Sequence, residues 1–189
     1  MKIQLLLAAA CAALACATSA AAEPTPLQVF ESVCLKGQSS QDWVRLARAE
    51  GFVIPPASFA DFFREQDDVQ GQVFWKVYDG GLVAVMAGAA APHKKGDLQG
   101  DVCGVFGMPY DPLIVGKLQA SLNVGAPQRD RDSATFVYDE QDGVRRGLED
   151  ASEEAMSRLV AAGRLHMVMA QAARDKSDMT TVVHIIMRP

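Results

Sequence analysis

The spacing of apolar residues near the start of the chain is that of an amphipathic helix. Leu27, Phe30 and Cys34 are separated by three and four residues, so a helix places all three on one face. Thr25 and Gln28 have the residue types and the spacing of a capping box, which satisfies free N–H groups at a helix start. The pattern therefore predicts a helix from Thr25 onward, with Cys34 facing the interior of the protein.

Further along the chain, helical and strand-like patterns alternate. The apolar runs 73–78 and 82–89 flank Asp79-Gly80, a pair of residues suited to a tight hairpin turn. Periodicity, capping residues and breaker residues together define the remaining elements. Helices are predicted over 25–37, 40–50, 111–125 and 150–162 and from residue 58, and strands over 73–78, 82–89, 101–107, 134–138, 165–173 and 180–188.

This order of elements favours an α+β fold. Helices come first, and strands separated by helices follow, which is typical of proteins whose helices pack against a mostly antiparallel sheet. We expect a single domain over residues 23–189, with helices packed on one face of the sheet. A sandwich of two sheets is less favoured, because too much of the chain has a helical pattern.

The first 22 residues have the three parts of a secretory signal peptide. Lys2 provides a basic start, the stretch 3–17 is apolar or small, and small residues precede an expected cleavage site near Ala22. The apolar stretch is shorter than the roughly 20 residues that span a bilayer. We expect a periplasmic or secreted protein. A lipid anchor at Cys16 is less favoured, since Ala13 stands where lipoprotein signals carry a large aliphatic residue.

Composition argues against nucleic-acid binding and against a membrane span in the mature chain. Removal of the signal leaves 167 residues with 23 acidic against 17 basic side chains, because Lys2 is lost, and a net charge of about −6. No basic stripe interleaved with aromatic residues is present, so nucleic acid is not an expected partner. No second long apolar stretch follows, so no membrane span is expected in the mature chain.

The expected mature chain keeps two of the four cysteines, Cys34 and Cys103. An even pair of cysteines in an exported protein is first interpreted as a disulfide. Such a bond would tie the first helix to the strand that contains Cys103. Because it closes a long loop, it would contribute roughly 4 kcal/mol in the chain-entropy model.

Cys103 is also the candidate nucleophile. Asp101-Val102-Cys103-Gly104 loosely resembles the Asp-Cys-Ser-Gly motif of the NlpC/P60 cysteine peptidases, and His166 is similar to their strand-opening histidine. The resemblance implies cell-wall hydrolysis with Cys103 as nucleophile and His166 as base. The chain departs from the motif, since the serine is absent, Val102 is inserted, and Gly104 opposes a helix starting at the cysteine. Hydrolysis is therefore the alternative prediction, and we lean against an enzyme.

His166 and His184 lie on the two terminal strands. A hairpin that pairs Val168 with Val182 would place the two imidazoles opposite each other, and facing imidazoles can begin a zinc or copper site. Strand alternation sends Met167 to the opposite face, so no third ligand of the right type is evident. Metal handling by this pair is the weaker alternative, and no cofactor is expected.

No complete catalytic constellation accompanies these residues. The chain lacks the Gly-x-Ser-x-Gly elbow of serine hydrolases and a Gly-rich phosphate loop. We therefore expect a non-enzymatic binding or interaction module of the bacterial envelope, whose partner is an unidentified envelope protein or a small ligand. The polar loop 92–100 is a candidate contact surface, because binding residues are common on loops.

Overall fold

The computed structural model describes residues 23–57, 69–90, 99–130, 133–171 and 179–189. Its helical segments are α1 (Pro26–Val29), η1 (Phe30–Cys34), α2 (Ser40–Ala49), α4 (Ile114–Leu122) and α5 (Glu153–Ala161). Its strands are β1 (Val69–Tyr78), β2 (Gly81–Ala90), β3 (Gln99–Gly107), β4 (Gln128–Arg129), β5 (Ser133–Gln141), β6 (Val144–Gly147), β7 (Leu165–Gln171) and β8 (Thr180–Arg188). The expected signal peptide, the helix expected from residue 58 and most of the polar loop lie outside the described residues.

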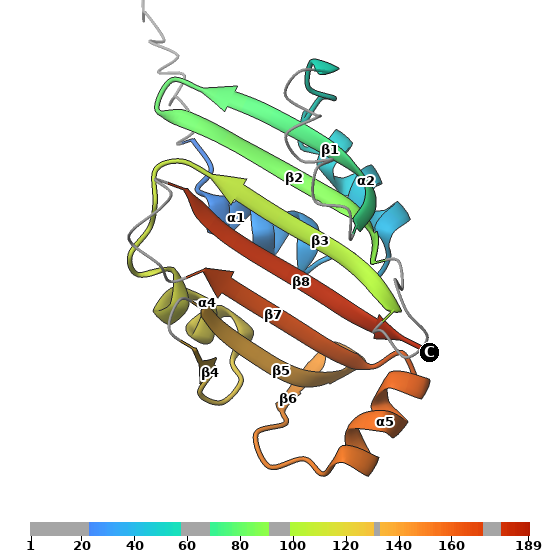
Figure 1. Ribbon diagram of the computed structural model, residues 1–189. Coiled ribbons are helices and arrows are strands. Elements are labelled where there is room, and N and C mark those ends of the chain that lie inside the picture. Colours follow the sequence, from blue (N-terminus) through green and yellow to red (C-terminus); the bar gives the residue numbers. More distant parts are fainter. Residues whose placement is uncertain (1–22, 58–68, 91–98, 131–132, 172–178) are drawn as a thin grey trace, which may run out of the picture.

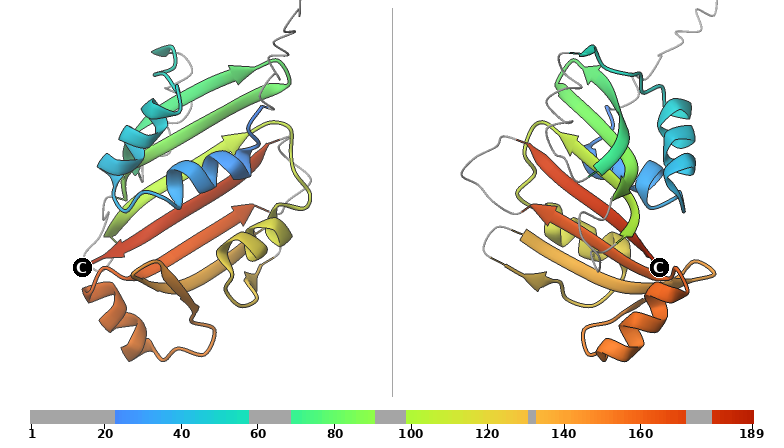
Figure 2. Two further views of the ribbon diagram at one scale, coloured as in Figure 1. Left: turned by 180° about the vertical axis from the view of Figure 1, so that it is seen from behind. Right: turned by 45° about the vertical axis from the view of Figure 1, so that its right-hand side comes forward.

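The strands form one eight-stranded antiparallel sheet (Figure 1). Its order is β1-β2-β3-β8-β7-β5-β4, with β6 paired to β5, so the last strand of the chain lies in the middle of the sheet. α1, η1, α2 and α4 lie on one face of the sheet, and α5 contacts β7 and β8 beside its end (Figure 2). The predicted α+β fold, with helices packed on one face of an antiparallel sheet, is confirmed.

The larger of two buried hydrophobic clusters among the described residues lies between these helices and the face of the sheet that they cover, and a smaller one lies on the opposite face. Successive strand residues point to opposite faces, so β3 directs Cys103 and Val105 toward the helices, and β8 directs His184 and Ile186 the same way. Phe30 of η1 packs against this face, and all five side chains are buried. Two of the candidate site residues, Cys103 and His184, therefore lie in the interior.

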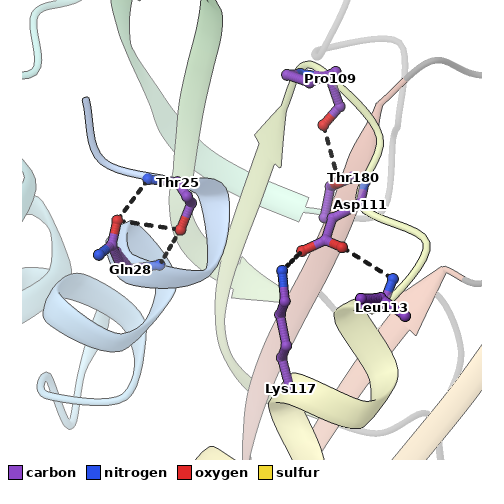
Figure 3. Close-up of polar contacts among 7 residues, drawn as sticks. All are labelled: Thr25, Gln28, Pro109, Asp111, Leu113, Lys117 and Thr180. Atoms are coloured by element: carbon purple, nitrogen blue, oxygen red, sulfur yellow. Dashed lines mark hydrogen bonds and ion pairs between the residues drawn. The ribbon is translucent and has the colours of Figure 1, made fainter. Parts of the chain in front are cut away.

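The capping box predicted at the first helix is confirmed. Thr25 Oγ1 accepts a hydrogen bond from the N–H of Gln28 at 3.3 Å, and the N–H of Thr25 donates to Gln28 Oε1 at 2.8 Å (Figure 3). After its first turn the helix widens into the π-helix η1, in which the N–H of Leu35 bonds to the carbonyl of Phe30. The segment ends with Cys34 buried against the sheet.

The turn predicted at Asp79-Gly80 is found at that position and joins β1 to β2, but neither residue adopts the positive φ angle expected of such a pair. Glu23 binds this turn from a distance in the sequence. Its carboxylate accepts a hydrogen bond from the N–H of Asp79 at 2.8 Å and from the N–H of Gly80 at 3.2 Å. The beginning of the described chain is thereby attached to the hairpin.

The register predicted for the two terminal strands is wrong. Val168 pairs with His184, and Val182 pairs with Ala170. The two registers differ by two residues, and side chains alternate with a period of two, so both bury the same faces. The hydrophobic pattern alone does not distinguish them.

Other corrections concern the edge of the sheet. β4 and β6 were not predicted, because they are short and polar and show no alternation of apolar residues. α5 occupies part of the predicted helix 150–162, but none of its residues is fully buried, since it packs beside the end of the sheet.

No helix among the described residues is long and apolar enough to cross a lipid bilayer.

Candidate functional site

A disulfide joins Cys34 of η1 to Cys103 of β3. The two Cα atoms are 5.5 Å apart, which is within the usual range for a disulfide. Both cysteines are completely buried, and they are 69 positions apart in the sequence. The predicted bond between the N-terminal helical segment and the sheet is therefore confirmed.

This bond determines what Cys103 can do. The attacking form of a cysteine is the thiolate, and a disulfide sulfur has none. Cys103 also lies within β3 instead of at a helix start, and its cross-strand partner is His184, whereas His166 lies one strand further away on β7. The geometry therefore gives no support to the hydrolase alternative, which required a cysteine at a helix start with His166 as its base.

His166 of β7 and His184 of β8 meet in the core, on neighbouring strands and diagonal to each other. Nδ1 of His166 and Nε2 of His184 are 2.9 Å apart. The ring planes differ by 24° and the ring centroids are 5.2 Å apart. Because the centroids are so much further apart than the two nitrogens, the rings meet end to end, as a linear N–H···N bond requires.

The carbonyl of Cys34 determines which nitrogen of His184 carries the proton. Nδ1 of His184 is 3.0 Å from this oxygen, and a carbonyl can only accept, so Nδ1 donates. Nε2 of neutral His184 then accepts from Nδ1 of His166. Burial and the neighbouring imidazole lower the pKa of His184 to about 3, and burial lowers the pKa of His166. Both histidines are therefore neutral at pH 7.

Trp43 of α2 donates a second hydrogen bond to the carbonyl of Cys34, with Nε1 at 3.1 Å. Carbonyls in the last turn of a helix lack partners within the helix, so these two donors satisfy an otherwise unpaired buried group. Gly37 gives the indole the space it occupies, because a Cβ at that position would overlap Cδ1 of Trp43. A single carbonyl thus connects η1, α2 and β8.

Tyr138 of β5 completes this buried polar cluster. Its Oη is 3.4 Å from Nε2 of His184, and its ring lies nearly parallel to that of His166, with centroids 5.2 Å apart. Burial raises the pKa of Tyr138 far above its ordinary value, so the phenol stays protonated. Towards the surface, Arg145 lies over the ring of Tyr138 and pairs with Glu140 at 2.8 Å.

The same bonds leave the histidine pair poorly arranged for metal binding. Zinc sites use three or four protein ligands, and within the described ranges no group of three or more His, Cys, Asp or Glu side chains is placed to hold a metal ion. The nitrogens of His166 and His184 that face each other are joined by a hydrogen bond. In this structure the pair supports the fold.

A second candidate site was not predicted from the sequence. A surface groove of about 610 Å³ lies beside α4, and we call it the α4 groove. Leu113 at its edge is 66% exposed. The sequence contained one indication of it. In the predicted helix 111–125, Leu113 does not lie on the apolar face that would point toward the interior. The groove is lined by Tyr110, Pro112, Leu113, Val115, Gly116, Lys117, Ala120 and Arg129.

Hydrogen bonds hold the loop between β3 and α4 against β8 (Figure 3). Thr180 Oγ1 accepts from the N–H of Asp111 at 2.7 Å and donates to the carbonyl of Pro109 at 3.3 Å. The Asp111 carboxylate accepts from the N–H of Leu113 at 2.9 Å and from Lys117 Nζ at 2.6 Å. Burial opposes the ionisation of Asp111, but these bonds outweigh it and lower its pKa. One wall of the groove is therefore prearranged.

Comparisons with known proteins assign no family to the chain. No protein-family model, curated protein or solved structure matches it. The residues and their geometry are therefore the basis for any functional conclusion.

Proposed function

We propose that this chain is an exported, disulfide-stabilised binding protein of the bacterial envelope that works by recognition and catalyses no reaction. One observation carries the proposal: the three candidate catalytic or metal-binding side chains that the sequence indicated, Cys103, His166 and His184, all lie in the core of the described structure. Cys103 is held in the disulfide, and His166 and His184 are bonded to each other. All three are buried, so none presents a nucleophile or a base to a substrate.

Export has support from both the sequence and the fold. Residues 1–22 have the pattern of a secretory signal, and disulfides persist in oxidising compartments but are rare in the cytosol. Glu23, the first residue after the expected cleavage site, is bonded to the β1–β2 turn. A mature chain that begins at Glu23 keeps this contact. We place the protein in the periplasm or outside the cell.

The proposed target is an envelope protein or a small ligand. Exposed apolar side chains gathered on a surface mark binding sites more often than scattered ones do. Leu113 and Met108, which are 66% and 42% exposed, lie on the loop between β3 and α4. Leu113 also lines the α4 groove, so this loop and the groove are the proposed binding surface.

The first test concerns the thiols and hydrolysis. Mature protein, residues 23–189, purified from the periplasm and denatured without reductant, is expected to show no free thiol. It is also expected to release no fragments from peptidoglycan before or after reduction. Two reactive thiols, together with peptidoglycan cleavage that Cys103→Ser abolishes, would replace the binding role with peptidase chemistry.

The second test concerns binding itself. Immobilised mature protein is incubated with envelope extract, and retained components are identified by mass spectrometry. We expect a component whose retention saturates and is competed by free folded protein. Denatured protein is the control competitor and should have no effect. If folded protein competes for no retained component, the binding role is contradicted.

A further inference from the structure

We propose that the α4 groove binds an extended acidic segment of a partner protein, with a bulky apolar side chain next to a carboxylate. This inference rests on the proposed binding function and specifies the chemistry of the partner. Three features of the groove point to it: an apolar wall fixed in place, a cation that no described ion pair offsets and a strand edge that no described strand covers.

The apolar wall is formed by Leu113 with Tyr110 and Pro112. Leucine is usually buried in folded proteins, yet Leu113 is 66% exposed. Its loop is held by the bonds of Asp111 and Thr180, so the side chain is presented on a fixed backbone. A surface arranged before binding loses little conformational entropy when a partner covers it.

Arg129 provides a positive charge that no ion pair among the described residues offsets. Lys117 also lines the groove, but its Nζ lies 2.6 Å from the carboxylate of Asp111, which offsets its charge. Arg129 makes no ion pair with any carboxylate of the described residues, whereas Arg145 and Arg164 each make one. A guanidinium binds a carboxylate through two parallel N–H donors. The charge of the groove therefore matches an acidic ligand.

No described strand pairs with the side of β4 that faces away from β5. β4 is the last strand in the described sheet order and pairs with β5. The N–H of Asp130 bonds to the carbonyl of Ser133 at 3.0 Å. Because backbone groups alternate in direction along an antiparallel pair, the N–H and C=O of Arg129 point away from β5. An extended peptide can add to such an edge through main-chain hydrogen bonds.

These features favour a peptide over the two other occupants of the right chemistry. A small apolar acid would use the wall and Arg129 but would leave the backbone edge unbonded. A second copy of the chain, related by a two-fold axis, would face β4 with β4. That arrangement would bring two Arg129 side chains of like charge close together. An extended acidic peptide satisfies all three features.

The experiment measures peptide binding by the full mature protein with its disulfide intact. The probe is the fluorescently labelled hexapeptide Val-Leu-Asp-Leu-Asp-Val, and its comparison has both Asp residues replaced by Asn. Arg129→Gln removes the charge, and Leu113→Ser removes the apolar side chain. Arg146→Gln, an exposed arginine on β6 outside the groove lining, is the matched control.

We expect the Asp peptide to bind about tenfold more tightly than the Asn peptide, the gain expected from hydrogen bonds to a charged group. Arg129→Gln should abolish this preference, and Leu113→Ser should weaken binding of both peptides. Arg146→Gln should change neither affinity. Backbone N-methylation of the Asp peptide should weaken its binding, because it removes the bonds to the strand edge.

Several outcomes overturn the inference. Equal affinities for the two peptides, or a preference unchanged by Arg129→Gln, would remove the role of the cation. Undiminished binding of the N-methylated peptide would assign the groove to a small acid. Self-association that Arg129→Gln abolishes would assign it to a second copy. If Arg129→Gln protein still retains its envelope component in such a case, the proposed binding function stands without this site.

Discussion

His184 is the residue at which the polar contacts of the core converge. Its Nδ1 donates to the carbonyl of Cys34, and its Nε2 accepts from His166. In the neutral state each of these ring nitrogens has a partner of the matching kind. An added proton would place a charge in a buried site, where it is less stable than in water. The stability of the fold therefore depends on pH.

We expect the protein to lose stability when the pH falls from 7.5 to 5. His184 titrates near its ordinary pKa of about 6.5 in the unfolded chain and at about 3 in the fold. Between these values the unfolded state binds more protons, so the free energy of unfolding falls as the pH falls. At pH 5 the loss from His184 is about 2 kcal/mol. Urea unfolding at the two pH values measures it.

The control for this prediction is His184→Gln, which keeps a polar side chain but does not titrate. The drop in unfolding free energy between pH 7.5 and pH 5 should be smaller in the variant by about 2 kcal/mol. An equal drop in both proteins would show that His184 does not stay neutral in the fold.

Gly37 has a steric role beside Trp43. Gly37→Ala should lower the free energy of unfolding by about 2 kcal/mol, because the new Cβ would overlap the indole and force the core to shift. Gly116→Ala is the matched control, since a Cβ there meets no atom within 4 Å on the exposed side of α4. It should stabilise the helix by roughly 0.5–1 kcal/mol. Urea unfolding at pH 7.5 that gives the same change for both variants would contradict this prediction.

Among the elements, η1 is held in place by a disulfide and by buried hydrogen bonds as well as by packing. The disulfide joins it to β3, and the carbonyl of Cys34 joins it to β8 and α2. α1 precedes it, and Glu23 connects the beginning of the described chain to the β1–β2 turn. The N-terminal segment is thus held to the sheet at two separate places.

Loss of the disulfide should destabilise the protein strongly. Replacing Cys34 and Cys103 together by Ala is expected to lower the free energy of unfolding by about 4 kcal/mol, because the bond restricts a long loop of the unfolded chain. Urea unfolding of the variant measures the loss. Reduced wild-type protein should show a similar loss, since it lacks the same restriction. A loss below about 1 kcal/mol would contradict the chain-entropy account.

Across the whole molecule, the sheet unites segments from the two ends of the chain. β8, from the C-terminus, lies between β3 and β7, and the covered face carries η1 from near residue 30. Folding therefore requires contacts between residues far apart in the sequence. Under the proposed export, the disulfide would form outside the cytosol, where conditions are oxidising.

The exported form is expected to start at Glu23. Expressed in a bacterium with its full sequence, the protein recovered from the periplasm should have the intact mass of residues 23–189 less two hydrogens for the disulfide. Reduction should add those two hydrogens back. A mass that includes an acyl group on Cys16, or retention of the first 22 residues, would contradict the expected processing. Mass spectrometry of the oxidised and reduced protein provides the measurement.

The sequence by itself determined the features that depend on neighbouring residues or on parity. Thr25 and Gln28 form their capping box because both partners lie within one helical turn. The turn at Asp79-Gly80 is also local, because the two residues are neighbours in the sequence. Cys34 and Cys103 were the two cysteines left to pair after the expected signal peptide. The order of helical and strand-like patterns was enough to indicate an antiparallel sheet with helices packed on one face.

The tertiary structure alone decided the features that depend on distant contacts. The register of β7 and β8 was open because a shift of two residues preserves the buried faces. The bond from His184 to the carbonyl of Cys34 joins residues 150 positions apart, and no local pattern encodes it. The α4 groove likewise forms only when Arg129 of β4 is brought beside Leu113 by the packing of α4 against the sheet. Periodicity specifies which face of an element is buried, whereas the position of one element relative to another is set by packing across the whole core.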